Sequence, residues 1–295
     1  MNNRVATGYG QPSHTLYDWT LGPSAAKSDS NFALPPIIRD HVRIERFVEK
    51  VSSSLYSNQQ DPVGLASDDE RQTLVKVLAS EYSELEEDIM RDASPVTEIY
   101  LRAAHLHLHL NAFFSPPSRP SYNTELVKLY SATQALLESC LGLEDTTSGT
   151  PSTPSLAYGS NYIFQMMLAA GFALMKLHAS FIYQVGLEPE SARKLFSRTV
   201  WALRGMSVQE NDLAQRLAEV LVQVWKGTRT GSSKDGRDTP QSHIDSSMQL
   251  KVRCRMSVSL VYDSVWRWRE DTQRRGGMSL ESKSCSGAFI VSLVR

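Results

Sequence analysis

The sequence predicts an all-α fold, an irregular array of about eight helices with a central C-terminal helix. Apolar residues recur at steps of three, four and seven along most of the 295-residue chain, the period of a helix with one buried face. No segment shows the strict alternation of a half-buried strand. Hydrophobic residues make up 41% of the chain, which is ample for a core of this size.

The stretch from 250 to 270 is predicted to be the helix around which the others pack. Its main stripe is apolar, but Met256 and Trp266 lie on other sides, so the helix is apolar on more than one flank. A soluble chain tolerates such a helix where other helices enclose it. Arginines such as Arg267 interrupt the pattern, with Asp263 as a nearby counterion. The main stripe consists of Leu250, Cys254, Val258, Val261, Val265 and Trp268.

Recognisable start signals mark the first helices. Two prolines at 35–36 precede a helix over about 37–56. The sequence SDDE at 67–70 matches a capping box and begins a second helix. A Ser-Pro pair opens a third helix over 94–113, because proline is tolerated in the first turn, where its missing N–H costs nothing.

The most hydrophobic run of the chain lies at 163–177. Its uninterrupted apolar part is too short to span a bilayer, so we expect a core helix and no membrane association. Gly171 within it predicts the close approach of a neighbouring helix. The same helical period predicts further helices at 126–140, 188–205 and 208–225.

Three histidines form the pattern His105-x-His107-x-His109 within the third helix. At 100° per residue, His105 and His109 fall within about 40° of each other, while His107 points about 160° away. The three side chains therefore cannot bind one metal ion from a helix. A site built on the first and last histidine needs a further ligand from elsewhere, so no metal site is predicted.

Composition divides the chain into three parts. Residues 1–34 are rich in Ser, Gly, Asn and Pro without any period, which predicts a disordered segment. The helical domain covers 35–272 and contains a flexible polar insertion at 227–243. The segment 273–295 is Ser-rich and then abruptly apolar, and we expect a poorly ordered tail.

Charge and cysteine content bound the environment of the chain. The net charge is −1 and the pI is near 6.7, so there is no overall electrostatic attraction to nucleic acid or anionic membrane. Cys140, Cys254 and Cys285 are far apart in sequence, which is typical of a reducing compartment. The first residues lack the pattern of a signal peptide, so we expect an intracellular protein.

Sequence motifs of catalysis are not found. The chain contains no P-loop, no complete G-x-G-x-x-G, no G-x-S-x-G and no H-E-x-x-H. No spacing places a nucleophile beside a base. We therefore predict no catalytic residues, no cofactor and no enzyme activity, while an enzyme assembled from scattered residues stays open as an alternative.

Three segments resemble helices of a known family. The segments 99–114, 162–181 and 255–270 are similar to helices in the regulatory half of fungal binuclear zinc-cluster transcription factors, in particular the regulators of leucine biosynthesis and of the weak-acid response. The resemblance covers residues 35–272 and rests on packing patterns. It implies a middle-homology type regulatory domain in that range and a nuclear protein that regulates transcription.

The resemblance also implies partners and limits. It implies protein partners, with a full-length zinc-cluster regulator as one candidate, and a small metabolite as a candidate effector. Such regulators control pathway genes, including secondary-metabolite clusters. The family reads DNA through a six-cysteine module, whereas this chain has three cysteines and no basic arm, so we expect no direct sequence-specific DNA binding.

A candidate pocket for such a metabolite is predicted where the two most buried helices meet. Its walls would be Phe172 and Met175 with Val261 and Trp268. The alternatives are a cytoplasmic helical scaffold or ligand-binding protein and, third, a helical enzyme.

Overall fold

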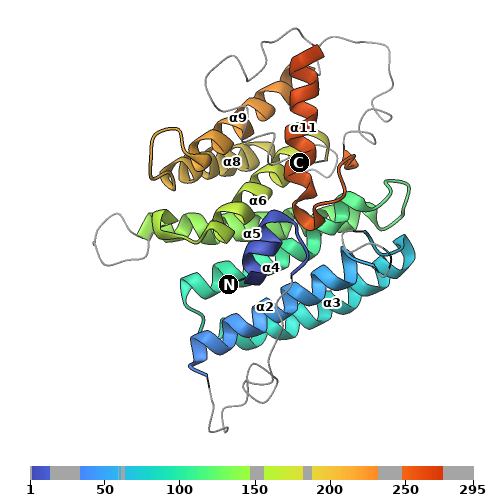
Figure 1. Ribbon diagram of the computed structural model, residues 1–295, viewed down its shortest axis with the longest axis vertical. Coiled ribbons are helices and arrows are strands. Elements are labelled where there is room, and N and C mark those ends of the chain that lie inside the picture. The colour runs from blue at the N-terminus through green and yellow to red at the C-terminus, as the bar shows by residue number, and fades with distance from the viewer. Residues whose placement is uncertain are drawn as a thin grey trace.

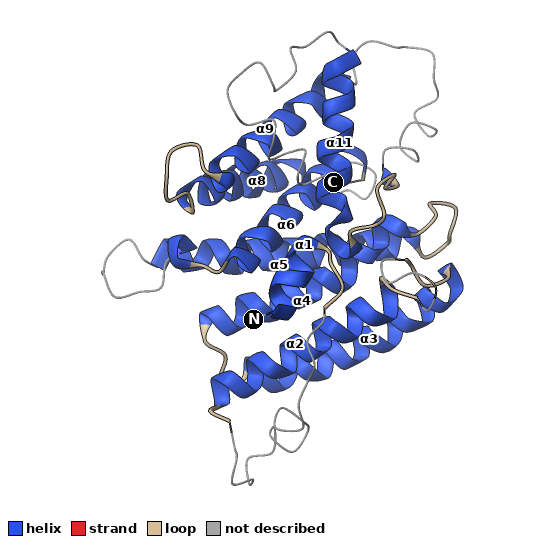
Figure 2. Cartoon of the chain, in the orientation of Figure 1, coloured by secondary structure: helices blue, strands red, loops and turns tan. Residues whose placement is uncertain are grey.

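The prediction of an all-α fold is confirmed. The computed structural model describes residues 2–13, 34–58, 60, 64–146, 156–181, 188–231 and 248–274. Within these ranges the chain forms nine α-helices and no strand (Figure 2). The helices are α1 (Asn2–Tyr9), α2 (Pro36–Leu55), α3 (Asp68–Met90), α4 (Pro95–His109), α5 (Tyr122–Thr146), α6 (Asn161–Ser180), α8 (Pro189–Gly205), α9 (Leu213–Gly231) and α11 (Ser259–Arg274), with short 3-10 segments η2 (Leu110–Phe114), η3 (Leu156–Tyr158) and η4 (Met256–Val258).

Neighbouring helices in the chain pack beside one another in a stacked array (Figure 1). At one end α3 lies along α2, which in turn packs on α4. The array continues through α5 and α6 to α8 and α9, and α11 closes it by packing on α6 and α9. Sequential packing of this kind keeps connections short and buries the apolar stripe of each helix against the next.

The centre of the array is α6, which contacts α1, α4, α5, α8, α9 and α11. Every residue from Tyr162 to His178 is buried. By length and composition α6 could cross a membrane, but 89% of its most apolar window is buried inside the protein, which fits the predicted core helix. The buried side chains of the other helices join α6 in one hydrophobic core.

Gly171 lies where α9 approaches α6, as predicted, since a Cβ atom added there would lie 2.8 Å from Cδ2 of Leu221. We expect Gly171→Leu to lower the free energy of unfolding by about 3 kcal/mol, because extra carbon atoms overpack this contact. Gly171→Ala should change it by less than about 1 kcal/mol, because the Leu221 methyl group can move aside and alanine favours the helix. Urea unfolding followed by circular dichroism measures both variants, and a Gly171→Leu protein as stable as the parent would contradict the prediction.

The prediction of one central helix over 250–270 is wrong in two respects: residues 250–258 are not part of the helix, and the helix does not lie at the centre of the array. The helix α11 begins only at Ser259, and the residues before it are irregular apart from η4. Met256 has a φ of 47°, which a continuous helix does not allow. The Asp263 carboxylate accepts hydrogen bonds from the backbone N–H groups of Lys251 and Val252, and these bonds hold the chain in a loop. Residues near the end of α11, such as Trp268, are only partly buried, so the centre belongs to α6.

The predicted disorder of 1–34 is wrong for residues 2–13, because α1 packs on α2, α6 and η4. Asn3 donates to the backbone oxygen and to the carboxylate of Glu45 on α2, both at 3.0 Å. Arg4 pairs with the same carboxylate, and its guanidinium group lies 3.8 Å from the ring centre of Tyr100. Gly10 has a φ of +64°, and a Cβ atom there would collide with the backbone of Arg255. Polar contacts to residues far along the chain therefore stabilise this helix. Residues 14–33 lie outside the described ranges.

Other boundaries also differ from the predictions. Ser67 precedes α3 as expected, but its hydroxyl group bonds the Glu70 carboxylate at 3.4 Å and does not cap a backbone N–H. The helix expected from 208 begins at Leu213, because Asp212 caps it by accepting from the N–H of Gln215 at 3.0 Å.

The predicted insertion and tail fall largely outside the described residues. The helix α9 continues to Gly231, so the first residues of the insertion predicted at 227–243 are helical, and 232–247 lie outside the described ranges. The last turn of α11 includes residues 273 and 274 of the predicted tail, and 275–295 lie outside the described ranges.

Candidate functional site

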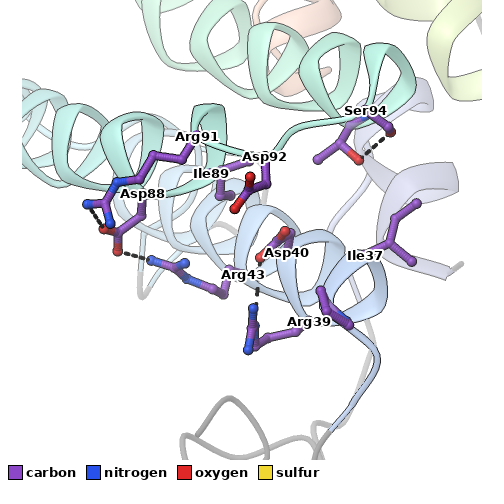
Figure 3. Close-up of a pocket in the computed structure, with 11 residues that line it drawn as sticks. Ile37, Arg39, Asp40, Arg43, Asp88, Ile89, Arg91, Asp92 and Ser94 are labelled. Carbon is purple, nitrogen blue, oxygen red and sulfur yellow. Dashed lines mark hydrogen bonds and ion pairs between the residues drawn. The ribbon is translucent and has the colours of Figure 1, made fainter. Parts of the chain in front are cut away.

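An open cleft of about 410 Å³ lies where the first turns of α2 and α4 meet the end of α3 (Figure 3). The first turns of α2 and α4 border the cleft, and the start of a helix carries a partial positive charge. Ile89 of α3 is a buried apolar residue in its wall, and Ile37 is exposed. The lining residues are Pro36, Ile37, Arg39, Asp40, Arg43, Asp88, Ile89, Arg91, Asp92, Ser94 and Thr97.

Charges of both signs alternate along the cleft (Figure 3). The Asp88 carboxylate pairs with Arg43 at 2.8 Å and with Arg91 at 3.3 Å, and the hydrogen bond from Arg43 lowers the pKa of Asp88. Nε of Arg39 lies 3.8 Å from the Asp40 carboxylate. Because the lining holds three arginines and three aspartates, the cleft has no net charge and suits a ligand or peptide with groups of both signs.

The hydroxyl groups in the cleft wall take part in the start of α4. Ser94 Oγ accepts a hydrogen bond from the backbone N–H of Thr97 at 3.1 Å and lies 2.9 Å from Thr97 Oγ1. Thr97 Oγ1 is 3.4 Å from Nε2 of His41, and burial lowers the pKa of that histidine. Since Thr97 is only 2% exposed, this chain of contacts is part of the packing that fixes the helix start.

The three histidines of α4 point as the helical period predicts. Nε2 of His105 and Nε2 of His109 lie 3.0 Å apart, and the His105 ring stacks on Tyr82 at 4.2 Å. His107 lies on the opposite side of the helix. In the described part of the chain, no group of three or more His, Cys, Asp or Glu side chains could hold a metal ion.

His107 joins three segments that are far apart in sequence. Its Nε2 atom lies 2.9 Å from Ser52 Oγ on α2, and its Nδ1 atom lies 2.6 Å from Ser257 Oγ in η4. The hydroxyl group of Tyr56 donates to the backbone oxygen of His107 at 3.0 Å. Burial lowers the pKa of His107 to about 3, so the ring is neutral and one nitrogen donates while the other accepts.

A buried ionic network connects α6, α11 and the loop before α11. The fully buried Asp263 carboxylate lies 3.3 Å from Nζ of Lys176 and 2.8 Å from Nε of Arg267. Its other oxygen accepts from the N–H groups of Lys251 at 2.7 Å and Val252 at 3.1 Å. Burial lowers the pKa of Lys176 to about 8, and the charge of Asp263 opposes this shift. The sequence indicated the pairing with Arg267, but it did not indicate Lys176 or the two backbone donors.

The four residues of the predicted pocket lie in or against the hydrophobic core. Phe172, Met175 and Val261 are buried, and Trp268 packs against the core as a partly buried side chain. Their helices α6 and α11 are in contact. None of the four lines the cleft at α2 and α4, and their role in ligand binding stays a prediction.

Comparison with known proteins relates this chain to a fungal regulatory protein. The relative is Regulatory protein LEU3 of Saccharomyces cerevisiae, with 19% identity over 299 residues. The match covers 92% of this chain but 33% of LEU3, so the chain spans about a third of the length of this relative. No family model and no solved structure matches the chain. The similarity supports a relationship to a region of a fungal regulatory protein and suggests a regulatory role.

Proposed function

We propose that this chain is a regulatory region of a fungal-type transcription regulator that acts in the nucleus by binding protein partners. The observation that carries this proposal is the similarity to LEU3 along 92% of the chain. One candidate partner is a full-length zinc-cluster regulator, and a small metabolite is a candidate effector. The controlled genes would belong to a metabolic pathway, with secondary metabolism as one candidate.

The geometry supports a role in binding more than one in catalysis. The cleft offers arginines and aspartates that a protein segment can pair with, and its hydroxyl groups are engaged at the start of α4. The buried charged groups Lys176 and Asp263 hold helices and backbone in place. We therefore propose a protein without enzyme activity, whose helical array presents surfaces to partners.

A reporter assay tests the proposal. The chain is fused to a bacterial DNA-binding domain in a fungal host that carries the matching operator before a reporter gene. We expect expression to change relative to the DNA-binding domain alone, and the strongly destabilised variant Asp263→Ala to weaken the effect. Microscopy of a tagged chain gives its localisation. Reporter expression that neither rises nor falls, together with a tagged chain that stays in the cytoplasm, would contradict the proposal and favour the cytoplasmic scaffold.

DNA binding by the chain alone needs a separate measurement. We propose that it has no DNA reader of its own, since its net charge is −1 and specific DNA binding draws on many phosphate contacts by Lys and Arg. A gel-shift assay should therefore show weak, salt-sensitive binding without preference for any duplex. Tight binding of one specific duplex at physiological salt would contradict this part of the proposal.

A further inference from the structure

The outer face of α8 and the elements beside it expose large apolar side chains. Among the described residues, the three most exposed large hydrophobic side chains are Tyr158 at 90%, Val208 at 82% and Trp201 at 76%. Trp201 is on α8, Val208 follows the end of that helix, and Tyr158 is in η3, which packs on α8. The place of a Cβ atom on Gly159 lies 3.3 Å from Cε of Met206, so Tyr158 is close to the end of α8.

The helix does not need this face for its own packing. The opposite side of α8 is buried against α5, α6 and α9. It supplies Leu195, Phe196, Thr199, Val200 and Leu203 to the core. Trp201 therefore remains largely in water although tryptophan is among the side chains that gain most from burial. Exposed apolar clusters of this kind mark interaction sites more often than isolated exposed residues do.

Positive charge surrounds the exposed tryptophan. Lys194, Arg198 and Arg204 are all exposed on α8, and at 100° per residue each lies within about 60° of Trp201 around the helix. From 191 to 208 the sequence contains four basic residues and no acidic one. The acidic side chains of this helix lie at its start, where Glu190 pairs with Arg193 at 2.5 Å. The face around Trp201 thus combines tryptophan and arginine, the residue types enriched at binding hot spots.

We propose that this face of α8, formed by Lys194, Arg198, Trp201 and Arg204, binds an acidic peptide segment of a protein partner. An apolar side chain of the peptide packs on Trp201, and its carboxylates pair with the surrounding cations. The inference rests on the proposed function and deepens it by naming the surface and the chemistry of the partner. Charge complementarity selects the occupant, because the three exposed cations within about 60° of Trp201 repel basic segments and attract acidic ones.

A peptide is favoured over nucleic acid as the occupant. Nucleic-acid binding at physiological salt draws on roughly six to ten phosphate contacts, whereas this face offers three exposed cations. The chain as a whole is slightly negative, which does not attract a polyanion. A short acidic peptide can be held by few cations when an aromatic side chain adds apolar contact area.

The test measures binding of a synthetic peptide to the full chain. The probe is a fluorescein-labelled peptide with Leu and Phe four residues apart, flanked by glutamates, and its anisotropy reports binding. We expect Trp201→Ala to weaken binding about tenfold or more. Lys194→Glu combined with Arg204→Glu should weaken it similarly, while Lys76→Glu, which reverses an exposed charge on α3, should leave it unchanged. The same peptide with lysines in place of glutamates should not bind.

Several results would overturn the inference. These are absence of peptide binding by the parent protein, equal binding by the Trp201→Ala protein, and tighter Trp201-dependent binding of single-stranded or duplex DNA. Self-association of the chain that Trp201→Ala abolishes would also overturn it, because the occupant would then be a second copy. If the fusion alters the reporter but the peptide does not bind, the inference fails and the proposed function stands. If the peptide binds but the reporter stays silent, the proposed function fails.

Discussion

Asp263→Ala is expected to lower the free energy of unfolding by about 3–5 kcal/mol. The substitution leaves the positive charge of buried Lys176 without its carboxylate partner. It also removes the acceptor of the part-buried N–H groups of Lys251 and Val252, so the loop before α11 loses both hydrogen bonds that tie it to the helix. The ion pair with Arg267 is lost at the same time. Urea unfolding followed by circular dichroism measures the effect.

Two further variants separate the contributions of charge and hydrogen bonding. Asp263→Asn keeps an oxygen that can accept from the loop but removes the charge, so its stability should lie between those of the parent and Asp263→Ala. Lys176→Met removes the buried cation, and Asp263→Ala should cost less in that background, because no uncompensated lysine remains. Equal costs of Asp263→Ala in both backgrounds would show that the lysine does not contribute, and a cost below about 1 kcal/mol would contradict the prediction altogether.

Helical periodicity placed most of the helices because it depends on local sequence alone. The core stripe of α8 could be recognised from Leu195, Phe196, Val200 and Leu203, and Trp201 falls outside that stripe. The starts of α2 and α4 followed from their prolines. These two starts border the cleft, but their meeting with the end of α3 depends on tertiary packing, which sequence period does not report.

The features that the sequence did not predict depend on partners far along the chain. The helix α1 has no clear apolar period, and its polar contacts include Glu45 and Tyr100. The loop before α11 reads as helical from its apolar spacing, but its backbone donors bind Asp263 instead of continuing a helix. His107 is an ordinary core histidine by position, and its bond to Ser257 spans 150 residues. Tertiary contacts override local preference in each case.

Acidification from pH 7 to pH 5 is expected to reduce the stability of this protein strongly. Burial lowers the pKa values of His107 and His109 to about 3 and that of His105 to about 4, from an ordinary value of 6.5. Below pH 6.5 the unfolded chain binds protons that the folded chain does not, so stability is full above pH 6.5 and falls until the folded pKa values are reached. At pH 5 each histidine that stays neutral in the folded chain then lowers the free energy of unfolding by about 2 kcal/mol.

Comparison of two variants attributes this loss to the buried rings. His107→Gln keeps an amide that can reach Ser52 and Ser257 but cannot take up a proton. It should be less stable than the parent at pH 7 and should lose about 2 kcal/mol less between pH 7 and pH 5. Ser257→Ala removes a partner but keeps the titrating ring, so its pH dependence should remain as steep as that of the parent. A free energy of unfolding that is equal at pH 7 and pH 5, or an identical slope for His107→Gln and the parent, would show that these histidines do not govern acid stability.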